Sequence, residues 1–177
     1  MIFFGNKKID NKWNWHHEVQ YRYYNAIGDL EQLLLRTGLG YNLTENYNNL
    51  FLGYGYILSE NYIGPAAKKK AVYEQRIYKQ FIARQQISRV GVQHRYRFEQ
   101  RFVEDDLKLR FRYFLGLNEP LNKVEIVDKT LYFSVYNEIF LNTKNNVFDR
   151  NRLYSGLGYR LNNSLKCEIG YMNQFLA

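Results

Sequence analysis

Residues 93–102 read Gln-His-Arg-Tyr-Arg-Phe-Glu-Gln-Arg-Phe, and this stretch decides the fold. Every second residue belongs to a charged row, while the residues between them form an aromatic row in which Gln100 is the exception. Successive side chains of a β-strand point to opposite faces, whereas a helix would scatter these charges around its circumference. The stretch therefore predicts a strand with one polar and one apolar face, as in a transmembrane barrel with a polar lumen.

The composition favours strands and a membrane interface. The chain has 177 residues and a net charge of +8, and its 17 Tyr and 12 Phe residues are far above ordinary usage. The length suits one domain, which we expect to span residues 1–177. Cys167 is the single cysteine, so an intrachain disulfide is excluded.

Two features bear on membrane insertion and export. The sequence has no run of 18 apolar residues and hence no expected transmembrane helix, but the mean hydropathy of −0.53 is uninformative for an alternating barrel. No secretory signal peptide is evident at the start of the sequence. If the protein is exported, we expect this chain to be a mature or trimmed form.

The alternation seen in residues 93–102 recurs along the chain. The nine expected strands cover residues 13–24, 31–41, 50–58, 74–84, 93–102, 107–115, 131–141, 152–161 and 165–175. Each has about ten residues, the length that crosses a bilayer at a tilt. Residues 2–5 form a short apolar piece before a turn expected at residues 6–11, and this piece is expected either near the rim or paired with the last strand. Residues 59–71, 85–89 and 142–149 are expected loops or turns, and residues 116–130 are expected to form a loop or the tip of a long hairpin. The prediction is an all-β, antiparallel, up-and-down transmembrane barrel of about ten strands, with twelve as the alternative.

The basic residues divide between the strands and the turns. Nine of the 12 Lys residues lie in expected turns or termini, where flexible, hydrated side chains suit the environment. Eleven of the 13 Arg residues lie in the polar phase of an expected strand: Arg22, Arg36, Arg76, Arg84, Arg95, Arg97, Arg101, Arg110, Arg112, Arg152 and Arg160. Four clear acidic residues share that phase, namely Glu18, Glu99, Glu138 and Glu168, so the expected lumen is strongly basic. Seven glycines also share it and leave room for Arg and Tyr side chains.

Three stretches carry a resemblance to a known family. They are residues 94–102 (His-Arg-Tyr-Arg-Phe-Glu-Gln-Arg-Phe), 137–142 (Asn-Glu-Ile-Phe-Leu-Asn) and 151–159 (Asn-Arg-Leu-Tyr-Ser-Gly-Leu-Gly-Tyr), and residues 18–22 extend the similarity toward the N-terminus. The chain resembles the bacterial domain-of-unknown-function family number 2490, which is placed among small outer-membrane β-barrels. The resemblance implies a bacterial outer-membrane location and lipid as the surroundings. It also implies a signal peptide and one further strand after Phe175, so we expect the sequence to be incomplete at both ends, and it supplies no activity.

The candidate site is the polar row: Arg22, Arg76, Arg95, Arg97, Glu99, Arg101, Arg110, Arg112, Glu138 and Arg152. One interpretation is a lumen that binds or selects small anions. The other is a structural network in which Arg97, Arg110 and Arg112 pair with Glu99, Glu138 and tyrosine hydroxyls, because side chains normally fill small barrels. The residues alone leave the oligomeric state and the openness of the lumen undecided.

Other functions find less support in the residues. His16 and His17 point to opposite faces and lack matching ligands, so we expect no metal, cofactor or catalytic group. A lipid-acting enzyme using Ser155 and His94 remains an alternative, although the G-x-S-x-G motif is absent. A second alternative is a soluble, basic β-barrel that binds nucleic acid, since the alternation alone does not say which face is inside. The family resemblance favours the membrane interpretation and argues against a nucleic-acid partner.

Overall fold

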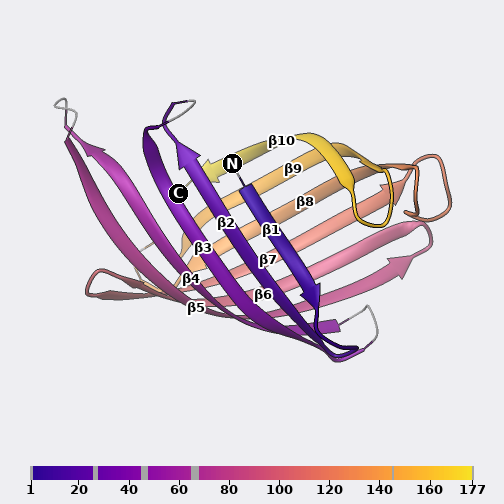
Figure 1. Ribbon diagram of the computed structural model, residues 1–177, viewed down its shortest axis with the longest axis horizontal. Helices are drawn as coiled ribbons and strands as arrows, with labels where there is room; N and C mark the ends of the chain where they lie inside the picture. Colours follow the sequence, from indigo (N-terminus) through magenta and orange to yellow (C-terminus); the bar gives the residue numbers. More distant parts are fainter. Residues whose placement is uncertain (1, 26–27, 45–47, 65–67, 145, 177) are drawn as a thin grey trace. The chain divides into compact units, whose positions relative to one another are not determined.

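The computed structural model describes residues 2–25, 28–44, 48–64, 68–144 and 146–176, and within them it contains ten β-strands. Each strand neighbours the next one in chain order within a single antiparallel sheet (Figure 1). The bounds are β1 Ile2–Lys8, β2 Trp13–Tyr23, β3 Leu30–Asn42, β4 Asn48–Ile63, β5 Lys68–Ile87, β6 Val90–Val103, β7 Asp106–Pro120, β8 Thr130–Asn142, β9 Phe148–Arg160 and β10 Lys166–Leu176. The predicted all-β, up-and-down arrangement of about ten strands is confirmed, in preference to the alternative of twelve. No helix that could cross a membrane occurs in the described ranges.

The chain forms two compact units, which are described separately. The first unit comprises Met1–Glu45, Asn49–Gln80 and Phe98–Arg110, and the second comprises Asn46–Asn48, Phe81–Arg97 and Phe111–Ala177. The first unit holds β1 to β3 and most of β4, and the second holds β8 to β10. Strands β5, β6 and β7 contribute residues to both units.

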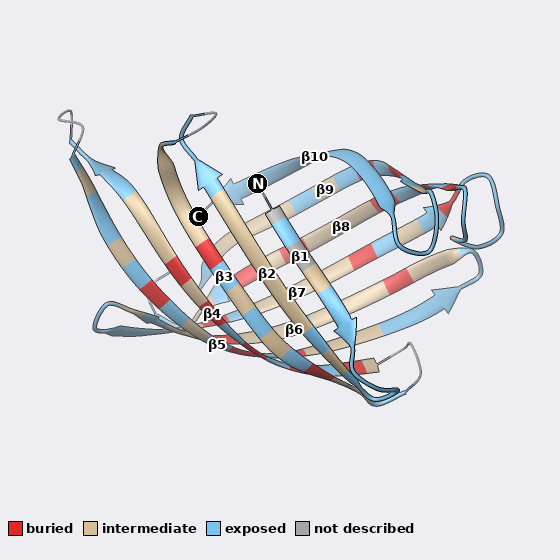
Figure 2. Cartoon of the chain, in the orientation of Figure 1, coloured by how far each residue is buried: buried red, intermediate tan, exposed pale blue. Residues whose placement is uncertain are grey.

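In the second unit, β8 shows the two faces most clearly. Tyr132 is 5% exposed and the next residue, Phe133, is 41% exposed; buried and exposed residues then continue to alternate along much of the strand (Figure 2). Pairing with β9 places Tyr132 opposite Gly158 and Phe133 opposite Leu157, so residues of one kind share a face. The predicted division of residues 131–141 between two faces is therefore confirmed.

The first unit repeats this pattern in β4. Phe51 and Ile57 are buried, whereas Leu52 is 56% exposed and Tyr54 is also exposed. Pairing with β3 places Leu39 opposite Leu52, and both leucines are exposed. In β4 and β8 the apolar phase of the sequence is thus the exposed face, and the phase that carries glutamate and glycine is the covered face, whereas β10 is exposed on both faces.

Several strands extend further than the sequence pattern predicts. The expected turn at residues 85–89 narrows to Ser88 and Arg89, because Ser88 adopts a left-handed φ of 53° that suits a two-residue hairpin. Lys68 to Lys70, expected in a loop, begin β5, and Arg150, expected in a loop, lies in β9. These loop predictions were wrong because backbone pairing continues where side-chain alternation has already become irregular. Strand β7 continues to Pro120 and β8 begins at Thr130, so residues 116–130 contain the tip of a long hairpin, one of the two predicted alternatives.

The N-terminal piece is a full edge strand rather than a fragment of four residues. Strand β1 continues through Lys8, so the turn expected at residues 6–11 begins later. It pairs with β2 from Ile2 opposite Gln20 to Lys8 opposite Asn14. The sheet order places β1 beside β2 at one end and β10 beside β9 at the other. The predicted alternative in which residues 2–5 pair with the last strand is therefore not seen in this order.

Glycines on the covered face lie beneath aromatic rings. A Cβ added at Gly158 would lie 2.1 Å from Tyr132 Cζ, and one at Gly53 would lie 2.3 Å from Tyr78 Cζ. Both rings come from an adjacent strand, and a Cβ at either glycine would require the ring above it to shift. These two glycines make room for large side chains as predicted, but the rings come from neighbouring strands, where side chains from across the barrel were expected.

Candidate functional site

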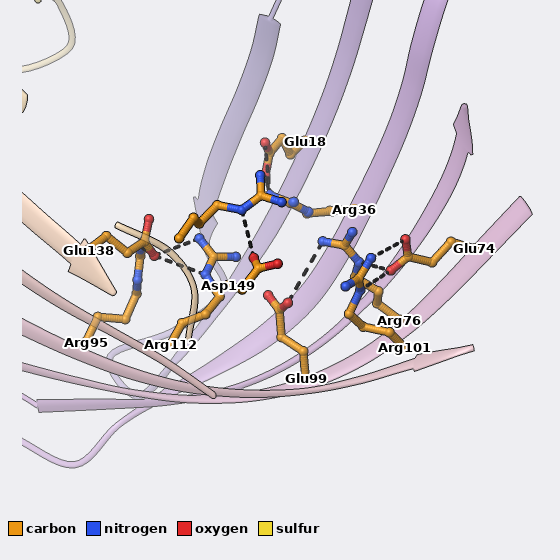
Figure 3. Close-up of polar contacts among 11 residues, drawn as sticks. Glu18, Arg36, Glu74, Arg76, Arg95, Glu99, Arg101, Arg112, Glu138 and Asp149 are labelled. Atoms are coloured by element: carbon orange, nitrogen blue, oxygen red, sulfur yellow. Dashed lines mark hydrogen bonds and ion pairs between the residues drawn. The ribbon is translucent and has the colours of Figure 1, made fainter. Parts of the chain in front are cut away.

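Glu138 of β8 is the centre of an ion-pair cluster in the second unit. Its Oε1 accepts hydrogen bonds from Arg95 Nη2 at 2.6 Å and from Arg112 Nη2 at 2.7 Å (Figure 3). Arg95 lies in β6 and Arg112 in β7, so side chains from three successive strands meet on the covered face. Glu138 is only 4% exposed, and a buried carboxylate needs such charge-assisted partners.

Three arginines lie over the ring of Phe140, which is two residues after Glu138 in β8. The guanidinium carbons of Arg112, Arg152 and Arg150 lie 4.4, 4.8 and 5.8 Å from the ring centroid. The face of an aromatic ring attracts cations, especially where water is excluded, and Phe140 is buried. Arg150 Nε also pairs with Asp149 Oδ2 at 2.7 Å. The ring therefore helps a cluster of like charges to pack together.

A row of aromatic rings crosses the same unit from β7 to β9. The centroids of Phe114 and Tyr136 lie 5.0 Å apart, and those of Tyr136 and Tyr154 lie 4.8 Å apart. Tyr136 and Tyr154 are directly opposite in the β8–β9 register, and the guanidinium carbon of Arg95 lies 4.6 Å from the Phe114 centroid. The row joins the ion-pair cluster to a continuous strip of packed rings, so the covered face here is filled by side chains.

The first unit contains a second cluster, centred on Glu74 of β5. Arg101 of β6 binds both oxygens of Glu74, through Nε at 2.6 Å and Nη2 at 2.9 Å, in a bidentate arrangement (Figure 3). Arg76 Nε also donates to Glu74, and Arg76 Nη1 lies 3.9 Å from Glu99 Oε2. Glu99 is 1% exposed, so both carboxylates of this cluster are buried among arginines.

A third ion pair joins β2 to β3. Arg36 Nη1 lies 3.2 Å from Glu18 Oε2, and the two residues are opposite each other in the strand register. Direct opposition brings the side chains of a cross-strand pair close enough to interact. Glu18 was expected on the polar face, and its contact with Arg36 agrees with that prediction.

The structure brings most of the predicted polar row into these clusters. Arg95, Arg112, Glu138 and Arg152 meet in the second unit, and Arg76, Glu99 and Arg101 meet in the first. Arg97 interacts electrostatically with Glu138, and Arg110 is buried in β7. Arg22 is different, because it is exposed near the end of β2 and donates to Gln20 Oε1 at 3.3 Å. The pairing of Arg112 with Glu138, considered in the structural interpretation, is present. Anion binding by this row stays a prediction.

Three members of the clusters were not recognised in the sequence. Glu74 has the same phase as Arg76, but it begins a weakly alternating segment and was not counted among the clear acidic residues. Asp149 was assigned to a loop, whereas β9 already begins at Phe148. Phe140 is an apolar residue on the polar face, and its phase, two residues after Glu138, is the signal that places it there.

The pair considered for a lipid-acting enzyme is not assembled. His94 Nδ1 lies 2.9 Å from Tyr113 Oη, and His94 Nε2 lies 3.3 Å from Gln85 Nε2. Ser155 lies in β9, three strand positions from β6, which corresponds to a separation of about 14 Å across a sheet. Among the residues that the structure describes, no group of three or more His, Cys, Asp or Glu side chains is placed to hold a metal ion.

Arginines outnumber carboxylates in the second-unit cluster. The arginines are Arg95, Arg97, Arg112, Arg150 and Arg152, and the carboxylates that they are recorded with are those of Glu138 and Asp149. Low-dielectric walls strengthen the field of such a group. Chemically, the arrangement can lock neighbouring strands together.

Comparison with known proteins gives the same family over the whole chain. Residues 1–177 match the family described as "Protein of unknown function (DUF2490)". An uncharacterized protein of Methylorubrum extorquens is 31% identical over 164 residues, covering 89% of this chain and 69% of the relative. No solved structure matches the chain.

The match spans every strand and both ion-pair clusters, so it agrees with the resemblance carried by residues 94–102, 137–142 and 151–159. The relative is itself uncharacterized, so the match shows the family and gives no activity. The chain belongs to the protein family of unknown function DUF2490.

Proposed function

We propose that this protein is a bacterial outer-membrane β-barrel whose exposed apolar face contacts lipid and whose arginine-rich face lines a narrow interior. We further propose that ion pairs and packed rings seal this interior, and that any residual conduction through it is of small anions. The role is structural or that of a minor pore, and no enzymatic reaction is part of the proposal.

The observation that carries the proposal is the inversion of the two faces. Leu39, Leu52 and Leu157 are each about half exposed, while Glu99 and Glu138 are almost completely buried. A soluble sheet places its apolar face in the core and its charges in water. The reverse arrangement is what lipid requires, because a lipid-facing leucine is favourable and an internal charge can be paired. This contrast also weighs against the soluble nucleic-acid-binding alternative.

Sealing is favoured over conduction by how the charges are held. Glu74 is bound by two arginines, as is Glu138, and rings such as Phe140 and Tyr136 fill the space beside them. Side chains fill the interiors of small barrels in general. The excess of arginine near Phe140 is the specific observation in favour of residual anion selectivity.

The membrane location is tested by expression and fractionation of the full-length protein. We expect it in the outer-membrane fraction, resistant to extraction by carbonate at high pH and soluble only in detergent. A detergent-free monomer that stays folded in buffer would overturn the membrane proposal, because its apolar face would then have to be compatible with water.

Conductance is tested by planar-bilayer recording of the purified protein. Silence supports the sealed interior, and small anion-selective currents support the pore. In the second case, Arg97→Glu combined with Arg110→Glu should weaken the selectivity, because each change replaces a positive by a negative charge. Cation selectivity of the unaltered protein would contradict the assignment of the arginine-rich face to the interior.

A further inference from the structure

A pocket of about 440 Å³ lies in the second unit, apart from the arginine clusters. Its lining comes from the hairpin of β5 and β6, from the end of β7 and from the β7–β8 loop at residues 121–129, and it includes Arg84, Gln86, Gln93, Asn118 and Glu125. Small-molecule sites in proteins have volumes of this order. The proposed function makes no use of this pocket, so its role is a separate question.

The loop that borders the pocket is tied in place from both sides. Arg89 Nη2 donates to the carbonyl oxygens of Pro120 at 2.6 Å and Lys123 at 3.0 Å, and Arg160 Nη1 donates to that of Ile126 at 2.7 Å. At the far end of the loop, Leu131 N donates to Asn122 Oδ1 at 2.9 Å. Such bonds hold a wall of the pocket in one conformation before any ligand arrives, which lowers the entropic cost of binding.

The polar groups of the pocket both donate and accept hydrogen bonds. Gln93 Oε1 accepts from Arg84 Nε at 3.0 Å, so the Gln93 amide is oriented and its Nε2 carries two N–H donors. Gln86 donates through Nε2 to the carbonyl oxygen of Ser88 at 3.2 Å, and its acceptor Oε1 lies toward Gly91. Asn118 adds another carboxamide. A matching ligand must therefore present donors and acceptors together.

The charge balance of the lining selects against ions. Charges of both signs line the pocket: Arg84 and Arg89 are positive and Glu125 is negative, and Arg89 directs its guanidinium to backbone carbonyl oxygens. A charged ligand of either sign would therefore meet a group of its own sign in the lining. Neutral hydroxyl groups suit both, because each hydroxyl donates one hydrogen bond and accepts others.

We propose that this pocket is a binding site for a neutral polyhydroxylated ligand, a mono- or disaccharide in size. Val92 and Ile126 supply its apolar surface for the C–H groups of a sugar ring, and the carboxamides with Arg84 and Glu125 supply its polar surface. The site is distinct from the arginine clusters, and its proposed ligand is neutral rather than anionic.

The binding experiment uses the full folded chain in a polyoxyethylene detergent, since a maltoside would itself offer a sugar. The probes are glucose, galactose, N-acetylglucosamine, maltose and lactose, with inorganic phosphate as the ionic comparator, followed by calorimetry and ligand-observed NMR. Saturable binding of at least one sugar, and weaker or absent binding of phosphate, is the expected result. Absence of binding by all five sugars, or preferential binding of phosphate, would overturn the proposal.

Gly91 allows a matched pair of variants. Its backbone is not left-handed, and a Cβ placed there would lie 3.5 Å from Gln86 Oε1 and 3.7 Å from the Asn118 carbonyl oxygen, which is ordinary contact. Gly91→Leu should fill the pocket and weaken sugar binding by at least about tenfold, whereas Gly91→Ala should keep the affinity within about threefold. Unchanged affinity in a folded Gly91→Leu protein would place the sugar elsewhere and overturn the proposal.

A second variant keeps the test decisive if Gly91→Leu does not fold. Gln93→Leu removes the oriented amide but nearly preserves the side-chain volume, and it should weaken sugar binding by about three- to tenfold, the worth of one hydrogen bond. Gln75→Leu is its control, because Gln75 lies in the first unit and accepts from Tyr54 Oη at 3.1 Å. Equal effects of the two changes would show that the pocket amide does not contact the sugar.

Discussion

Removing the carboxylate of Glu138 should be among the most destabilising changes in the protein. Glu138→Gln keeps the shape of the side chain but leaves the guanidinium groups of Arg95 and Arg112 beside each other without the charge that both contact at 2.6–2.7 Å. The Arg112 side chain is 9% exposed and that of Arg95 is 20% exposed, so water compensates little. Breaking a buried ion pair in this way costs about 3–5 kcal/mol.

The matched control is Asp106→Asn. Asp106 Oδ2 lies 3.7 Å from Lys108 Nζ, and both side chains are about half exposed. A pair in this position contributes about 0–1 kcal/mol, because water already solvates both charges. The free energy of unfolding is measured by urea titration in lipid vesicles, with circular dichroism of the sheet as the signal.

The cause of the loss can be separated from its size by a double substitution. If the loss comes from like-charge repulsion, Arg95→Met should cost less in the Glu138→Gln background than in the unaltered protein, with a coupling of about 0.5–3 kcal/mol. Equal costs of Glu138→Gln and Asp106→Asn, or the absence of coupling with Arg95, would refute the reasoning that these arginines depend on the carboxylate.

Three further predictions concern the other features of the sheet. Phe111→Arg places a charge on the exposed apolar face and should make folding into lipid vesicles less favourable by roughly 2–4 kcal/mol. Phe111→Leu should leave the stability nearly unchanged, and equal tolerance of both substitutions would contradict the lipid-facing assignment. Gly158→Ala should lower the free energy of unfolding by about 1–3 kcal/mol, because the added Cβ meets the Tyr132 ring. A smaller loss in a Tyr132→Ser background, measured in a double-mutant cycle, would identify that contact as the cause. The pKa of Asp29 is lowered by hydrogen bonds from Lys69 and Tyr62, so its stabilising effect should be present above its ordinary pKa of 3.8 and be lost as the pH falls through the lowered value. Limited proteolysis at and below pH 3.8 should cleave the unaltered protein faster as the pH falls and the Asp29→Asn variant at the same rate throughout. A pH-dependent cleavage rate in that variant would assign the effect to another group.

The faces of the strands could be predicted from the sequence because alternation is a local property. Leu131 to Leu141 needs no knowledge of its neighbours to show which side chains share a face, and the structure keeps that division. Strand ends were harder, since Lys68 to Lys70 and Arg150 lie in strands although their surroundings do not alternate. Pairing there depends on backbone hydrogen bonds, which side-chain patterns do not reveal.

The partners of each charge could not be predicted for a different reason. Glu138 is opposite Arg152 in the β8–β9 register, yet its carboxylate accepts hydrogen bonds from Arg95 and Arg112 on the other side. Choosing among these partners requires the registers of three strand pairs and the directions of long side chains. The pocket beside residues 121–129 was also missed, because it is made by a loop whose tethers, Arg89 and Arg160, lie more than 30 residues away.

The chain-order arrangement of the strands has a consequence for how the protein folds. Since every strand neighbours the next one along the chain, each hairpin needs only a short loop to close, and closure entropy grows slowly with loop length. Strands can therefore be added one after another to any hairpin that has formed. The contact between Arg95 and Glu138 spans 43 positions and three strands, so it closes only after β6, β7 and β8 have all found their registers. We therefore expect this ion pair to form late in folding and to stabilise only the state in which all three strands are in the correct register.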